Sequence, residues 1–144
     1  MNNLLRFGRI SLFVIYFWFG ILKVLGLSPA EPLVHNLFDQ ILGNWMNFET
    51  FNKAFGLAEC LIGIIWLVPN WTKAALVVLL AHMVATFLPV FFLPNDTWQN
   101  WFTPTLVGQY IIKNLALISL GLLIFKLELE KVNLKKFDLL RSEI

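Results

Sequence analysis

Four ionisable residues interrupt long apolar stretches of the sequence and are the first candidates for chemistry: Lys23, Glu59, His82 and Lys113. A charged side chain at the centre of a membrane-spanning helix costs about 2.5–3.5 kcal/mol, so such residues face a partner charge or a wet cavity. Glu59 can neutralise only one of the two lysines. The remaining positive charge would attract an anionic or carbonyl-bearing ligand, and the imidazole of His82 would relay a proton near neutral pH.

Helical spacing gathers further polar side chains around these four. Tyr16 shares a helical face with Lys23 in the first apolar stretch. Gln109 shares a face with Lys113 in the last one, and Asn114 lies beside them. The sequence therefore predicts that one polar pocket is lined by Lys23, Glu59, His82, Lys113, Tyr16, Gln109 and Asn114.

The residues leave three uses for this cluster open. The first is a buried ion network that fixes the helices against one another. The second is a site for an anionic or carbonyl-bearing ligand, and the third is a path for protons or ions. No metal site is predicted, because no Cys, Asp or Glu stands at ligand spacing from His82. A free-standing enzyme is disfavoured, since the sequence shows no nucleophile with a base, no metal cluster and no nucleotide motif. Whether any reaction is catalysed stays open.

The elements that must position these residues are predicted to be transmembrane helices. Of the 144 residues, 58% are hydrophobic and 14% are charged, whereas a soluble domain carries roughly 25% charged residues. A net charge of +2 with scattered basic residues argues against binding to nucleic acid. About 20 apolar residues cross a lipid bilayer, and four windows approach or reach that length: residues 8–27, 54–69, 74–93 and 105–125. We expect the first window to be retained rather than cleaved as a signal peptide.

The distribution of lysine and arginine predicts the orientation of these helices. If four helices alternate, most basic residues outside the helices fall on one side, and only Lys53 lies in a loop on the other. Both termini are then cytoplasmic in a bacterial plasma (inner) membrane. Apolar positions recur at helical spacing in the first outer loop and predict an amphipathic helix there. The expected fold is all-α, a four-transmembrane-helix bundle in which residues 1–144 form a single integral membrane domain with a cytoplasmic tail at 126–144.

Two short stretches of the sequence carry a family resemblance. They read FGILK, which contains Gly20 and Lys23, and GLAECLIG, which contains Glu59 between two glycines. Together with Arg9 and the hairpin leading to His82, they resemble the DoxX-like membrane proteins, including the neighbouring family of the reactive-chlorine-resistance inner-membrane protein. The resemblance covers roughly residues 8–125. After this range the chain departs from the commoner DoxX pattern and reads FKLELEKVNLKKF.

This resemblance implies a four-helix membrane bundle linked to thiol or sulfur redox chemistry, to quinone reduction by a larger complex, or to resistance against oxidative stress. The leading functional hypothesis is a DoxX-like membrane subunit that binds a quinone-like or small polar ligand in its outer-leaflet pocket. One alternative is a structural or assembly subunit of a larger membrane protein complex with no ligand of its own. The other is a small transporter or proton path.

Overall fold

The computed structural model describes residues 2–43 and 45–142, including the side chains of 3–43, 45–134 and 141. The described residues are 83% helical and contain no strand. An isolated bridge between Trp98 and Pro104 closes the loop that follows the fifth α-helix. The elements are α1 (Asn2–Val24), α2 (Glu31–Ile41), α3 (Phe48–Trp66), the 3-10 turn η1 (Pro69–Trp71), α4 (Thr72–Phe92), α5 (Pro94–Thr97), α6 (Leu106–Lys113) and α7 (Leu115–Ser142).

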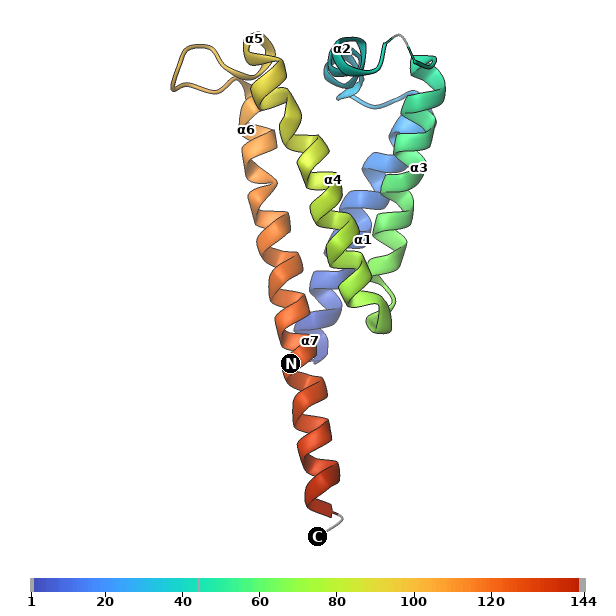
Figure 1. Cartoon of the computed structure of the whole chain (residues 1–144), viewed down its shortest axis with the longest axis vertical. Coiled ribbons are helices and arrows are strands. Elements are labelled where there is room, and N and C mark those ends of the chain that lie inside the picture. The colour runs from blue at the N-terminus through green and yellow to red at the C-terminus, as the bar shows by residue number, and fades with distance from the viewer. Residues whose placement is uncertain (1, 44, 143–144) are drawn as a thin grey trace.

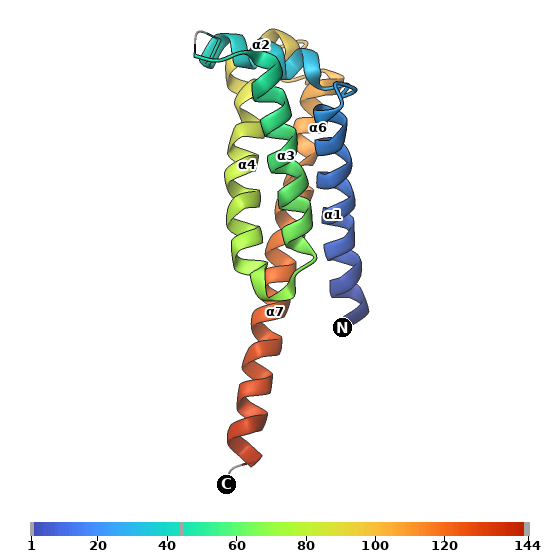
Figure 2. The same ribbon diagram turned by 90° about the vertical axis from the view of Figure 1, so that its right-hand side faces the viewer.

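The long helices form two groups that diverge toward one end of the molecule (Figure 1). α1 packs along α3, while α4 packs against α6 and α7. We call the end that holds α2 and α5 the loop end, and the opposite end, where η1 joins α3 to α4, the hairpin end. Figure 2 shows α2 lying across the axis of the long helices at the loop end. α7 continues well past the hairpin end without a neighbouring helix (Figure 1).

Three helical segments are long and apolar enough to cross a membrane, which indicates a membrane protein. They are Asn3–Val24, Pro69–Phe92 and Leu106–Leu134, with mean hydropathies of 1.6, 2.3 and 1.8 in their most apolar windows. Their outward faces are apolar as well. On α1, for example, four outward side chains are 47–71% exposed: Phe7, Ile10, Val14 and Trp18. Apolar residues on the outside as well as the inside are expected where lipid is the solvent.

Helix ends are set by local sequence and differ in places from the predicted windows. α3 begins at Phe48 rather than at 54, because the side chain of Asn47 accepts a hydrogen bond from the Glu49 amide at 2.7 Å and caps the helix. The window 105–125 is divided at Asn114 into α6 and α7. α7 then runs to Ser142, so the expected tail at 126–144 is helical up to that residue, and positions 143 and 144 lie outside the described residues.

The core lies between α1, α3, α4 and α7. It is built from large apolar side chains that recur at helical spacing, among which Leu12, Trp66 and Leu79 are fully buried. Ile124 adds the contribution of α7. The buried residues of this cluster are Leu5, Leu12, Tyr16, Ile62, Trp66, Ala75, Leu76, Leu79, Met83 and Ile124.

Candidate functional site

A buried ion pair joins α1 to α3 toward the loop end. The ammonium of Lys23 donates to Oε1 of Glu59 at 2.8 Å and to Oε2 at 2.6 Å. Lys23 is 7% exposed and Glu59 is 5% exposed, so neither charge is solvated by bulk water. Removing one partner of such a pair leaves an uncompensated buried charge. Two of the three N–H groups of Lys23 point to the carboxylate, and a third donor is left for another acceptor.

His82 on α4 extends the ion pair into a chain of hydrogen bonds. Its Nε2 lies 3.1 Å from Oε1 of Glu59, and its Nδ1 lies 3.4 Å from the hydroxyl of Tyr16 and 3.3 Å from that of Thr86. Because an ionised carboxylate only accepts, Nε2 carries the proton that binds Glu59. The hydroxyl of Thr86 donates to the backbone carbonyl of His82 at 3.1 Å. With a neutral imidazole, the hydroxyl of Tyr16 therefore donates to Nδ1, and a chain from Tyr16 to Lys23 crosses three helices.

Aromatic rings cover this polar chain. The ring of Phe55 stacks on the imidazole of His82, with centroids 5.2 Å apart and planes 19° apart. The ammonium of Lys23 lies 5.5 Å from the centroid of the same ring, within the range of a cation–π contact. The ring of Tyr16 meets the imidazole edge-on at 5.3 Å. The network is therefore enclosed by π-faces that hold the imidazole in one orientation.

Close contact between α1 and α3 brings Lys23 within reach of Glu59. A Cβ atom added to Gly20 would lie 2.6 Å from the carbonyl oxygen of Gly56 and 2.8 Å from the amide nitrogen of Cys60. A Cβ on Gly56 would in turn lie 2.6 Å from the carbonyl oxygen of Gly20. Small residues at facing positions let two helix backbones approach this closely. The glycines in FGILK and GLAECLIG thus place the ion pair.

The structure does not bring the α6 residues to this network. Lys113 and Gln109 are exposed, and the ammonium of Lys113 lies over the ring of Tyr110, 4.9 Å from its centroid. Asn114 is half-buried at the break between α6 and α7. Of the predicted lining, four residues come together: Lys23, Glu59, His82 and Tyr16. The surplus positive charge expected from Lys113 therefore lies elsewhere.

A second buried network lies at the hairpin end. The guanidinium of Arg9 donates to the carbonyl of Trp66 at 3.0 Å, to the hydroxyl of Thr72, and to Oε2 of Glu128 at 3.2 Å. The hydroxyl of Thr72 in turn donates a hydrogen bond to the carbonyl of Pro69 at 2.6 Å. Arg9 thereby ties the turn between α3 and α4 to α1 and α7. From the sequence, Arg9 entered only through the family resemblance and was not predicted to be buried, although it shares a helical face with the buried residues of α1.

An apolar layer separates the two networks. Leu12 and Leu79 are both fully buried. Each lies about one helical turn nearer the hairpin end than Tyr16 on α1 and His82 on α4, respectively. Trp66 is also fully buried there, and its indole N–H has no hydrogen-bond partner within the described part of the chain. Polar contacts therefore run from the loop end down to Tyr16 and resume only at Arg9.

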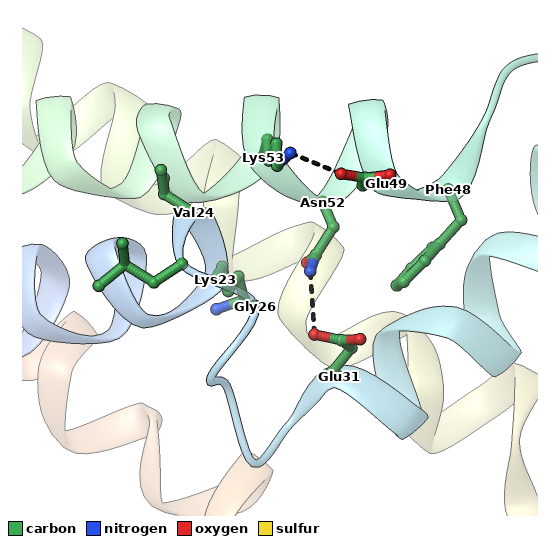
Figure 3. A pocket seen from close by; sticks show the side chains of 9 residues that line it. Lys23, Val24, Gly26, Glu31, Phe48, Glu49, Asn52 and Lys53 are labelled. Carbon is green, nitrogen blue, oxygen red and sulfur yellow. Dashed lines mark hydrogen bonds and ion pairs between the residues drawn. The ribbon is translucent and has the colours of Figure 1, made fainter.

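A pocket of about 500 Å³ opens beside the ion pair, where α2 approaches the ends of α1 and α3 (Figure 3). Lys23 forms part of its wall as well as part of the buried network. At its lip, Lys53 donates to Oε1 of Glu49 at 2.6 Å. The wall consists of Lys23, Val24, Leu25, Gly26, Glu31, Phe48, Glu49, Asn52 and Lys53. Among these residues, only Lys23 was predicted from the sequence to belong to the site.

No group of three or more His, Cys, Asp or Glu side chains that could hold a metal ion occurs among the residues described. Cys60 is buried, and its thiol faces the backbone carbonyl of Phe17 at 3.6 Å. The chemistry this site offers is ion pairing, hydrogen bonding and proton exchange.

The fold and the site together define an all-helical protein with three apolar helices of membrane-spanning length and a buried ionic network. No family model, curated protein or solved structure matches the chain.

Proposed function

We propose that the chain is a multi-pass protein of the bacterial plasma membrane that holds a small polar or quinone-like ligand in its loop-end pocket. In this proposal the part of α3 from residue 54 onward belongs to a fourth membrane span, α2 is the amphipathic helix on the outer surface, and both termini are cytoplasmic. The resemblance of FGILK and GLAECLIG to DoxX-like proteins supports a place in redox or oxidative-stress physiology. The chain would then act as a subunit of a larger redox complex or beside one.

The observation that carries the proposal is the double position of Lys23. Its side chain belongs to the wall of the pocket and also donates to both carboxylate oxygens of Glu59. The third N–H of this ammonium is free to meet a carbonyl or other oxygen of a ligand. A bound oxygen would therefore be joined through Lys23 to a buried carboxylate and, through that carboxylate, to the imidazole of His82.

This arrangement suits exchange of a proton with the ligand. Glu59 is in hydrogen-bond contact with Lys23 and with Nε2 of His82, so a proton that leaves the ammonium can be replaced along the chain. Tyr16 ends the chain at Nδ1. A redox step would need an electron donor from a partner, and the residues of this site bind, orient and exchange protons.

A complete proton path is a weaker candidate. The fully buried side chains of Leu12 and Leu79 interrupt the polar contacts between Tyr16 and Arg9. Proton movement needs a chain of polar groups or ordered water, and buried leucine side chains offer a water molecule no hydrogen-bond partner. We therefore place proton exchange in the loop-end half only. A purely structural subunit remains the alternative that the test below separates.

The test is mass spectrometry of the small molecules that stay with the tagged chain after gentle detergent extraction from its native membrane. A double variant, Lys23→Met with Glu59→Leu, removes the pair without leaving a buried charge, a change that is often neutral for stability. We expect a stoichiometric ligand in the parent protein and its loss from this variant. The matched control removes the ion pair at the hairpin end, Arg9→Met with Glu128→Leu, and should retain the ligand. A chain that carries no small molecule but always the same protein partner would favour the structural subunit.

A further inference from the structure

We propose that the loop-end pocket binds a primary ammonium group, held between the carboxylate of Glu31 and the side-chain oxygen of Asn52. The inference rests on the ligand pocket of the proposed function and names the chemistry of its occupant. Figure 3 shows these two side chains pointing toward each other across the pocket, one from α2 and one from α3.

The first observation is an unpartnered acceptor. Asn52 is only 4% exposed, and its Nδ2 donates to Oε2 of Glu31 at 3.4 Å. Its Oδ1 has no hydrogen-bond partner among the residues that the structure describes. Exchanging the positions of Oδ1 and Nδ2 would not satisfy the oxygen, because a carboxylate only accepts and Nδ2 must therefore face Glu31. A buried polar atom left without a partner is costly, so this oxygen calls for a donor that enters the pocket.

The second observation is the charge balance of the pocket wall. The ammonium of Lys23 is paired with Glu59, and that of Lys53 is paired with Glu49 at 2.6 Å. In the described part of the chain, the polar contact of Glu31 is the neutral amide of Asn52. The wall therefore carries one carboxylate without a cation beside it. A ligand that brings a positive charge and several N–H donors meets both needs at once.

The ring of Phe48 is the third group of the pocket wall that suits an ammonium ligand. It lines the same pocket beside Glu31, and Figure 3 shows it reaching into the space between α2 and α3. The imidazole of His35 packs edge-on against this ring, with centroids 4.1 Å apart, and helps to fix it. An aromatic face attracts a cation within about 6 Å. On the other wall, the third N–H of Lys23 would donate to an oxygen of the ligand, so an amine that also carries an oxygen fits best.

Two sources supply this chemistry. One is a lipid headgroup of the ethanolamine type, and the other is a free small amine on the same side of the membrane. Both present an –NH₃⁺ group with three donors. A choline headgroup carries the same charge without any N–H, and it therefore separates hydrogen bonding from charge attraction alone.

The experiment uses the full chain in lipid nanodiscs. Native mass spectrometry of discs that hold phosphatidylethanolamine and phosphatidylcholine in equal amounts reports which lipid stays bound. Calorimetric titration of ethanolamine or choline into discs of phosphatidylcholine and phosphatidylglycerol reports binding of a free amine. Retention of the ethanolamine lipid identifies the headgroup as the source, and binding of ethanolamine well above choline identifies the free amine.

Three variants decide the assignment. Glu31→Gln removes the negative charge that attracts the ammonium, and Asn52→Leu removes the Oδ1 acceptor, so each should weaken binding about tenfold or more. Asp39→Asn makes the same charge change on α2 outside the pocket and should leave binding within about twofold. Glu31 is half-buried, so Glu31→Gln remains informative if Asn52→Leu fails to fold.

Several results would overturn the proposal. One is equal retention of the two lipids together with no preference for ethanolamine over choline. Another is a loss of binding in Asp39→Asn as large as in Glu31→Gln. A neutral ligand that depends on Lys23 and Glu59 but not on Glu31 would overturn the ammonium assignment and leave the proposed function intact. A native chain without any bound small molecule would overturn both.

Discussion

Substitution of Gly20 by alanine tests whether helix contact places the buried ion pair. The new Cβ would lie 2.6 Å from the carbonyl oxygen of Gly56, whereas ordinary contacts begin at 3.4 Å. The backbones of α1 and α3 must then separate by about 0.8 Å, because a carbonyl in a helix cannot turn away. That displacement matches the margin between the 2.8 Å hydrogen bond from Lys23 to Glu59 and the distance of about 3.5 Å at which such a bond is lost.

We expect Gly20→Ala to lower the free energy of unfolding in detergent by about 2–3 kcal/mol. Overpacking costs about 1–3 kcal/mol, and a loosened ion pair adds to this, while the better helix propensity of alanine returns at most about 1 kcal/mol. Gly56→Ala should lower the free energy of unfolding by a similar amount. The double variant should cost less than the sum of the two, because the first alanine has already moved the helices apart.

The matched control is Gly8→Ala on the same helix. Its new Cβ would meet the flexible end of Ile124 at 3.1 Å, and a side chain can yield where a backbone cannot. The measurement is the midpoint of thermal unfolding in detergent, followed by circular dichroism and by ligand retention. If Gly20→Ala melts within one or two degrees of Gly8→Ala, or if the two alanines are additive, the contact does not set the geometry of the site.

Three further predictions concern charges. Glu59→Gln should cost about 3–5 kcal/mol, because it leaves the ammonium of Lys23 buried without a counter-charge, and Lys23→Met in the same chain should restore most of the loss in a denaturation series. Arg9→Lys should cost about 1–2 kcal/mol, since an ammonium cannot reproduce the fork of a guanidinium, and proteolysis should then cut the turn between α3 and α4 faster. The hydrogen bond and the charge of Lys53 lower the pKa of the Glu49 carboxyl, so this pair stabilises the fold above the ordinary carboxyl pKa and the contribution is lost as the pH falls through the lowered value. Lys53→Met should return that pKa toward its ordinary range in an NMR titration.

Helical spacing was enough to bring part of the site together. Lys23, Glu59, His82 and Tyr16 each interrupt an apolar run, and a polar group in such a run is driven toward the interior, where the others also lie. Lys113 looked equivalent in the sequence, yet it stands just before the break at Asn114 and its long side chain reaches the outside. The hydrophobic periodicity runs through this position and does not mark the break.

The pocket residues were harder to find because they meet only through tertiary docking. Glu31 and Asn52 lie on different helices, and their contact depends on where α2 settles after the turn at Gly26. Neither stands in a pattern that marks a site. The burial of Arg9 could have been predicted, since it recurs at helical spacing with Leu12 and Tyr16.

The placement of α2 bears on how quickly an occupant can exchange. This short helix touches both α3 and α4, and its buried side chain is Phe38, which packs on two phenylalanines of α3. Releasing one buried phenylalanine costs about 1.5–3 kcal/mol, far less than separating the long helices. At the upper end of that range, α2 is detached in roughly 1% of the molecules at equilibrium. Local openings of this kind take microseconds to seconds. Residence time in the pocket would then be set by α2 lifting away, independently of the stability of the bundle beneath it.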